Sequence, residues 1–166
     1  MKKLLMTFAA VAMMVSAASA QSLLDMNFED GTHTFKAWSQ QDTLLTVVDS
    51  SKANNSEHAL QFKVGAFVDV KGFKKDVKYR LSFDKKFVNG KTDGSVTLSV
   101  YNPDVEGKFQ KIVDQKLSQV KEFETVSYEF TSPRPFGGHR LVITPSSEGK
   151  GGGCFIIDNL KIEVVK

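Results

Sequence analysis

Cysteine is nearly absent from this chain, which has 1 cysteine in 166 residues. A lone thiol has no partner for an internal disulfide, so the fold must be held together by its hydrophobic core. The one cysteine, Cys154, precedes the apolar stretch 155–157. In such surroundings a thiol usually serves as a small hydrophobic side chain, and a reactive or dimer-forming thiol is the alternative.

Long apolar runs are also missing, apart from one near the beginning. Residues 4–15 are apolar except for Thr7, they follow Lys2 and Lys3, and small residues occupy positions 18–20. This pattern predicts a secretory signal peptide over residues 1–20. The run is too short to span a bilayer, and no later stretch approaches the roughly 20 apolar residues of a membrane helix. We therefore expect a periplasmic or secreted protein without membrane insertion. Because no cysteine lies near the cleavage site, we do not expect a lipoprotein.

A strong charge of one sign is a third absence. The chain carries 22 basic and 19 acidic residues, for a formal net charge of +3. Residues 1–20 contain two lysines and no acid, so the net charge without them falls to +1. Nucleic-acid binding rests on a concentrated basic surface, and near-neutrality therefore argues against nucleic acid as a partner. It argues equally against docking on an anionic membrane.

Recognisable catalytic motifs are the fourth absence. The chain has no Gly-x-Ser-x-Gly turn and no His-Glu-x-x-His motif, and His33, His58 and His139 stand singly. Cys154 lacks the sequence context of a cysteine protease. The catalytic carboxylates of glycosidases come together in space rather than in sequence. The acidic residues of this chain therefore neither support nor exclude a glycosidase. The sequence gives no positive argument for catalysis, and we expect a protein that is not an enzyme.

What the chain has in abundance is alternation of apolar and polar residues. It extends over strand-length runs at residues 60–64, 79–87, 96–101, 126–130 and 160–164. This period of two is typical of strands with one buried and one wet side. Clusters of Gly, Pro, Asn, Asp and Ser separate the runs and leave no room for crossover helices. Residues 21–166 are therefore predicted to form a single all-β domain, an antiparallel two-sheet β-sandwich or jelly roll.

The apolar positions of these runs predict the core, because a strand buries every second side chain. The side chains expected to be buried are Leu81, Phe83, Leu98, Val100, Val126, Tyr128, Leu141, Ile143, Leu160 and Ile162.

Several short motifs follow one another in a characteristic order. They lie at Leu23–Gly31, Trp38, Asn54–Phe62, Tyr79–Asp84 and Phe155–Ile162. In this order they resemble the galactose-binding-like jelly rolls, especially the carbohydrate-binding modules appended to bacterial xylanases and glucanases. The resemblance spans the chain after residue 20. It implies a jelly-roll fold and a non-catalytic role in binding a polysaccharide or oligosaccharide.

The resemblance also implies a structural calcium site that ties the opening segment to the final strand. In such modules an acid of the opening motif and an acid of the closing motif supply carboxylates, here Glu29 and Asp158. Backbone carbonyls near Gly31 and in the turn at 52–55 would complete the site, since calcium takes about six to eight oxygen ligands. The alternative is that both acids cap or stabilise turns.

Candidate ligand-binding residues follow from the chemistry of sugars. A sugar ring offers an apolar face for aromatic stacking and a rim of hydroxyls for polar side chains. Arg80, Asp84 and Tyr101 lie on the polar side of their predicted strands and form the predicted binding surface if those strands are sheet neighbours. Trp38, the only tryptophan, is the fourth candidate. Further aromatic residues that could line a loop or rim are Phe67, Phe73, Phe109, Phe123 and Phe136.

Tryptophan and tyrosine are scarce, with 1 Trp and 3 Tyr, which leaves few good platforms for stacking. The scarcity weakens the case for a sugar-binding protein, and two alternatives stay open. One is a protein-interaction or structural domain of the bacterial envelope, because a sandwich fold does not fix a function. The other is a small jelly-roll enzyme that degrades a polysaccharide.

Overall fold

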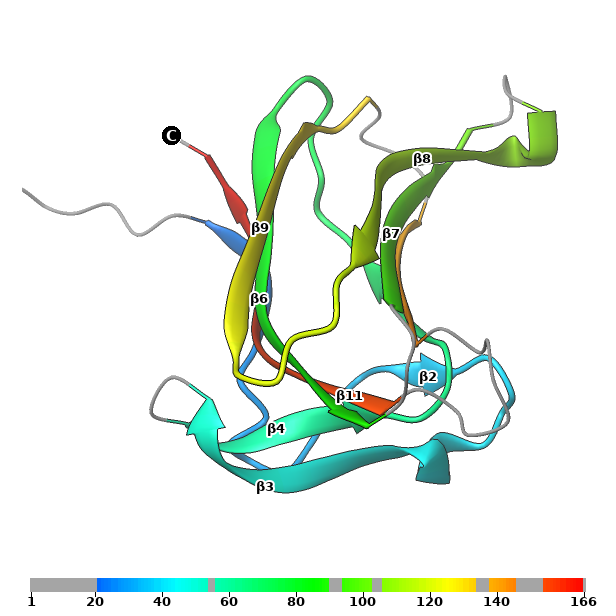
Figure 1. Ribbon diagram of the computed structural model, residues 1–166. Coiled ribbons are helices and arrows are strands. Elements are labelled where there is room, and N and C mark those ends of the chain that lie inside the picture. Colours follow the sequence, from blue (N-terminus) through cyan, green and yellow to red (C-terminus); the bar gives the residue numbers. More distant parts are fainter. Residues whose placement is uncertain are drawn as a thin grey trace, which may run out of the picture.

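Two antiparallel sheets pack face to face in the computed structural model, which confirms the predicted β-sandwich (Figure 1). The structure describes residues 21–53, 56–89, 94–102, 106–133, 138–145 and 154–165. Sheet A contains, in spatial order, β3 (Leu45–Ala53), β4 (Ser56–Phe62), β11 (Cys154–Val164), β6 (Lys78–Asn89) and β9 (Glu124–Thr131), and β1 (Ser22–Met26) also pairs with β11. Sheet B contains, in spatial order, β2 (Lys36–Ala37), β5 (Ala66–Val70), β10 (His139–Pro145), β7 (Gly94–Tyr101) and β8 (Phe109–Leu117). The short 3-10 turns are η1 (Asp42–Leu44) and η2 (Glu106–Lys108). Within the described residues, no helix has the length and apolar character needed to cross a membrane.

Alternation decides which side of each strand faces the core. In β7 every second side chain is buried, and those between are partly or fully exposed. The predicted core residues that prove to be buried are Leu81, Phe83, Leu98, Val100, Leu141, Ile143, Leu160 and Ile162. Val126 and Tyr128 are only partly buried, because β9 lies at the edge of sheet A. Cys154 is buried, and this burial raises the pKa of its thiol.

Polar side chains within the core are paired. Lys85 Nζ donates to the backbone oxygen of Ser118 at 2.9 Å and forms an ion pair with Glu124 at 2.8 Å, which fastens the connection between β8 and β9 onto β6. His139 Nε2 lies 3.0 Å from Ser132 Oγ. Ser132 and His139 are both buried, so their contact belongs to the packing of the core.

β11 is the central strand of sheet A and changes its neighbour partway along. Its first half pairs with β4 and its second half with β1, while β6 follows its other edge. The change occurs at Asp158 and Asn159, where the register with β6 shifts and Asn159 adopts a φ of 50°. Asparagine tolerates this left-handed conformation better than most residues. The sequence thus allows a bulge at the point where the two partner strands meet.

Candidate functional site

The four residues predicted to bind a ligand fall into two groups. Arg80 and Asp84 belong to β6 of sheet A, Tyr101 ends β7 of sheet B, and Trp38 directly follows β2 of sheet B. The prediction that Arg80, Asp84 and Tyr101 share one surface is therefore wrong. Because β6 and β7 lie in different sheets, their polar sides face outward on opposite sides of the sandwich.

Arg80 and Asp84 are both engaged by other protein groups. Arg80 Nη2 lies 2.8 Å from Glu129 Oε1, and this hydrogen bond raises the pKa of the Arg80 guanidinium. Asp84 was expected on a wet side, yet it is only 2% exposed. Its carboxylate accepts hydrogen bonds from the Thr125 hydroxyl and, at 2.8 Å, from the Asn159 amide. The bulge in β11 supplies that amide, so Asp84 is covered although it points away from the core.

A cluster of aromatic and charged side chains occupies one corner of the outer side of sheet B. Trp38 is 53% exposed and packs on Phe67, with 4.6 Å between ring centroids. Arg140 Cζ lies 4.2 Å from the Phe67 centroid and 5.7 Å from that of Trp38. Asp69 accepts two hydrogen bonds from Arg140, at 2.7 and 3.1 Å, which lower the pKa of Asp69 and raise that of Arg140. This bidentate pair holds the guanidinium against both rings and so pre-organises the platform.

The exposed position of Trp38 has a local cause. Its backbone N–H donates to the Gly65 carbonyl at 3.0 Å, which aligns it beside β5. A Cβ atom at Gly65 would lie 3.1 Å from Trp38 Cδ1 and 3.2 Å from Thr144 Oγ1. A glycine at this position lets the indole ring lie directly over the neighbouring backbone.

A second pair of aromatic rings lies at the diagonally opposite corner of sheet B. Tyr101 is 41% exposed and Phe109 is 55% exposed, and they face each other across β7 and β8. Their ring centroids are 5.8 Å apart in an edge-to-face arrangement. From the spacing of strands and the rise per residue, about 25 Å separates Tyr101 from Trp38.

Short side chains line the outer side of sheet B between these corners. Those of β7 are Ser95, Thr97 and Ser99, and those of β10 include Val142 and Thr144, all partly exposed. The result is an elongated surface with aromatic rings at both ends and hydroxyl groups along the middle. We call it the sheet B face, and its defining residues are Trp38, Phe67, Thr97, Ser99, Tyr101, Phe109 and Arg140.

The aromatic residues that were expected to line a loop or rim lie in different parts of the structure. Phe67 and Phe109 belong to the sheet B face, whereas Phe73 is buried in the core. Phe123 is partly buried beside β6, where Lys86 Nζ lies 5.6 Å from its ring centroid. Phe136 lies outside the described residues.

Asp69 and Arg140 are functional candidates that the sequence prediction missed. Alternation does contain a signal for them, because Asp69 stands between two buried valines in β5 and Arg140 precedes buried Leu141 in β10. Both residues could therefore have been placed on a polar side. Alternation carries no information about which strands are neighbours. It could therefore not predict that Asp69 of β5 pairs with Arg140 of β10.

Glu29, one of the predicted calcium ligands, caps the beginning of β4. Its carboxylate accepts a hydrogen bond from the Ser56 hydroxyl and further ones from the backbone N–H groups of Glu57 and His58, at 3.2 and 3.1 Å. These hydrogen bonds, that from Ser56 above all, lower the pKa of Glu29. The capping role that was left open for this acid is therefore observed.

Asp158, the other predicted ligand, lies at the bulge in β11 and is buried. Burial raises the pKa of its carboxyl, and the charges of Asp84 and Glu29 add to this effect, while a hydrogen bond from Ser56 opposes it. Glu29 and Asp158 thus both contact Ser56. Among the described residues, no three His, Cys, Asp or Glu side chains are grouped to hold a metal. A cation at this junction would need backbone carbonyls as well, and residues 54–55 of the expected turn lie outside the described part of the chain.

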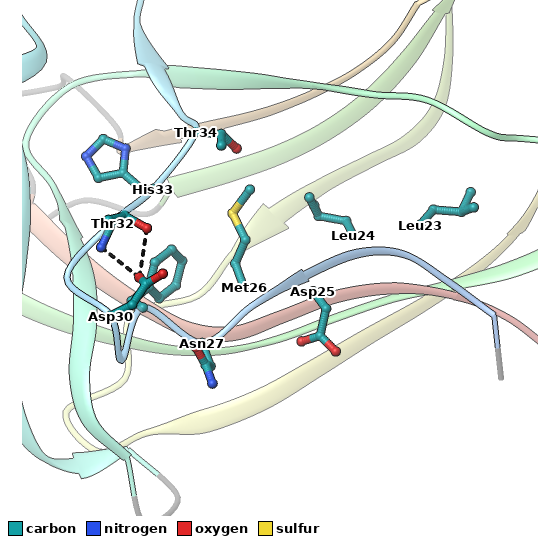
Figure 2. Close-up of a pocket in the computed structure, with 10 residues that line it drawn as sticks. Leu23, Leu24, Asp25, Met26, Asn27, Asp30, Thr32, His33 and Thr34 are labelled. Atoms are coloured by element: carbon teal, nitrogen blue, oxygen red, sulfur yellow. Dashed lines mark hydrogen bonds between the residues drawn. The ribbon is translucent and has the colours of Figure 1, made fainter. Parts of the chain in front are cut away.

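A separate pocket of about 360 Å³ lies along β1 and the loop that follows it (Figure 2). Leu24 and Met26 point to one side of the chain there, and Asp25 points to the other. Asp30 accepts hydrogen bonds from the backbone N–H and the hydroxyl of Thr32, at 2.9 and 2.7 Å, which fixes the turn. The pocket belongs to the sheet A side of the molecule and is distinct from the sheet B face.

Comparison with known proteins identifies a matching family and several solved structures with a similar fold. The profile of a family described as "Carbohydrate binding domain" matches residues 20–146. The CBM22-1 xylan-binding domain from Paenibacillus barcinonensis Xyn10C has a TM-score of 0.64 at 16% identity, with 91% of this chain and 99% of that one covered. The C-terminal family 22 carbohydrate binding module of Clostridium thermocellum Xyn10B has a TM-score of 0.66 at 14% identity, over 88% and 96% of the two chains. TmCBM61, solved in complex with β-1,4-galactotriose, has a TM-score of 0.56 at 17% identity, over 88% and 100%. At such identities these likenesses establish a shared fold. No curated protein matches the chain.

Proposed function

This chain belongs to the carbohydrate-binding domain family, and on that premise we propose that it binds a polysaccharide along the sheet B face and releases it unaltered. The observation that carries the proposal is the placement of Trp38 and Tyr101. Both rings are exposed, they lie on the same side of the same sheet, and a strip of short side chains connects them.

The sheet B face has the features that recognition of a sugar chain requires. Trp38 and Tyr101 offer aromatic rings to the apolar faces of sugar rings, and Thr97 and Ser99 offer hydroxyls to the polar rims. The distance of about 25 Å between the aromatic corners accommodates several sugar rings in line, which favours a chain over a single sugar. Water competes for every hydroxyl at an open surface, so we expect a Kd between about 1 μM and 1 mM.

Isothermal titration with xylan, glucan, mannan, galactan and alginate oligosaccharides tests this proposal. The variants W38A and Y101A each remove an exposed ring without opening a cavity in the core. Each should weaken binding about three- to tenfold. The matched control is F123A, which removes an aromatic ring beside sheet A and should leave the Kd unchanged.

Other outcomes would favour the alternatives. Binding that is equal in W38A, Y101A and the wild-type protein would remove the ligand from the sheet B face. Heat from none of the oligosaccharides would leave the protein-interaction domain as the leading interpretation. New reducing ends or unsaturated products after incubation would indicate an enzyme.

We further propose that residues 1–20 direct export and that the protein acts in the periplasm or outside the cell. The basic residues Lys2 and Lys3, the apolar run and the small residues at 18–20 support this proposal. Mass spectrometry of the protein recovered from the periplasm and the medium should show a chain that begins at Gln21. Recovery of the uncleaved chain from the cytoplasm alone would contradict it.

We also propose that Glu29 and Asp158 contribute to a structural calcium site at the bulge in β11. Asp158 is a buried carboxylate with the charges of Asp84 and Glu29 nearby, and a divalent cation would offset this repulsion. Such an ion would join the segment after β1 to β11, on the side of the sandwich away from the proposed sugar-binding surface.

A further inference from the structure

We propose that the sheet B face prefers polysaccharides that carry carboxylate groups, such as uronic acid substituents, over their neutral counterparts. This inference rests on the proposed function and adds the charge of the ligand to it. It comes from an excess of basic side chains on the outer side of sheet B that have no acidic partner among the described residues.

The charged side chains on the outer side of sheet B are predominantly basic. The strand register identifies the charged residues that point outward. The cations are Lys36, Lys111, Lys116 and Arg140, and the anions are Asp69 and Asp114. Both anions are already paired. Asp69 is held by Arg140, and Asp114 lies 2.8 Å from Lys111. The remaining basic groups are therefore available to a ligand.

Lys36 and Lys71 are the available cations around Asp69. Lys36 lies opposite Phe67 in β2, and Lys71 follows β5 two residues after Asp69. Both side chains are exposed, and neither forms an ion pair with another described residue. Both lie close enough to Asp69 to add to the lowering of its pKa, which the hydrogen bonds from Arg140 chiefly cause. The nearby carboxylate of Asp42 accepts a hydrogen bond from the backbone N–H of Ala37 at 2.9 Å.

The outer side of sheet A is different, because several of its basic groups are paired with acids. Arg80 lies between Glu129 and Glu163, at 2.8 and 3.7 Å, and Lys161 lies 3.6 Å from Asp25. The near-neutral charge of the whole chain therefore conceals an uneven distribution. A positive field on one side attracts anionic ligands to that side.

Arg140 also carries a positive charge in this cluster, but we do not assign it to binding the ligand. Its guanidinium is occupied by Asp69 and lies against Phe67. A polysaccharide that extends from Trp38 along the sheet B face would instead bring its carboxylate substituents toward the ammonium groups of Lys36 and Lys71. Exposed charge pairs contribute modestly, so we expect the two lysines together to improve affinity about three- to tenfold. Salt should weaken this part of the affinity.

The experiment compares polysaccharides that differ only at their carboxyl groups. Glucuronoxylan, polygalacturonate and alginate are each tested beside their carboxyl-reduced forms by affinity electrophoresis, at low and at high salt. We expect at least one acidic form to bind more tightly than its reduced form at low salt, and the difference to shrink at high salt. In the double variant K36Q/K71Q, affinity for that acidic form should fall about three- to tenfold, while affinity for its reduced form should stay unchanged.

The double variant K78Q/K161Q is the matched control, since it removes the same charge from the outer side of sheet A and should behave like the wild-type protein. Equal binding of the acidic and reduced forms would overturn this inference and leave the proposed function standing. Equal losses for both forms in K36Q/K71Q would also overturn it, because the lysines would then contribute without regard to charge. Failure of all six polysaccharides to bind would contradict the proposed function, and the inference would fall with it.

Discussion

At the scale of single residues, Trp38 combines two properties that rarely coincide. It is the only tryptophan of the chain, and it is one of the most exposed large hydrophobic side chains among the described residues. Its fluorescence therefore reports on one corner of the sheet B face and on nothing else. This gives a direct test of where a ligand binds.

We expect the emission of Trp38 to shift to shorter wavelength as an oligosaccharide saturates the protein. The physical reason is that a stacked sugar ring replaces water over an indole that is 53% exposed in the free protein. A fluorescence titration should return the same Kd as calorimetry. Calorimetric binding without any change in emission would place the ligand away from Trp38.

At the scale of strands, alternation predicted which side of each element faces the core but not which elements are neighbours. The inward positions of β6 and β7 were correctly predicted, as buried Phe83 and Leu98 show. Arg80 and Tyr101 were nevertheless assigned to one surface, because alternation places both on the polar side of their strands. The chain passes from sheet A to sheet B between β6 and β7, and a period of two contains no trace of that transfer.

The partners of Asp84 and Asp158 were hidden from the sequence for a related reason. These two residues lie opposite each other on β6 and β11, which are far apart in the chain. Their burial depends on the bulge at Asn159 and on the approach of the segment around Glu29 and Ser56. No local pattern encodes contacts over such distances, and only the resemblance to a family indicated that Glu29 and Asp158 would meet.

The bulge in β11 also leads to a prediction about pH. The pKa of Asp158 lies above its ordinary value of 3.8, because burial and the charges of Asp84 and Glu29 disfavour the ionised form. The folded state therefore holds this proton more tightly than the unfolded state does. The group favours folding while it is protonated, and this contribution is lost as the pH rises through the raised pKa.

In calcium-free protein we accordingly expect D158N, which cannot ionise, to gain stability relative to the wild-type protein as the pH rises above about 4. Urea unfolding in the presence of a chelator, over a series of pH values, measures the difference between the two proteins. Carboxyl groups with lowered pKa values, such as Asp69, favour folding at higher pH, but they act in both proteins and cancel. A difference that stays constant with pH would contradict the raised pKa.

At the scale of the whole molecule, the proposed calcium ion would connect the beginning of sheet A to its centre. Chelation should then lower the Tm of the wild-type protein, and added calcium should restore it in a concentration-dependent way, because a ligand of the folded state stabilises it by mass action. D158N should lose this response, and its Tm should be the same with calcium and with chelator. Magnesium at the same concentration controls for ionic strength. A Tm of the wild-type protein that ignores both chelator and calcium would remove the site.

The central position of β11 has a consequence for how the protein acquires its structure. This strand comes last in the described chain, yet β1, β4 and β6 all pair with it. Until residues 154–164 are available, the pair β3–β4, the pair β6–β9 and strand β1 have no strand that joins them into one sheet. Pairings between distant parts of a chain form slowly, because the loop between them must close first. Sheet A of the nascent chain should therefore stay open until synthesis is almost complete, and that delay would suit the export proposed above, in which the chain passes through a membrane pore in an extended form.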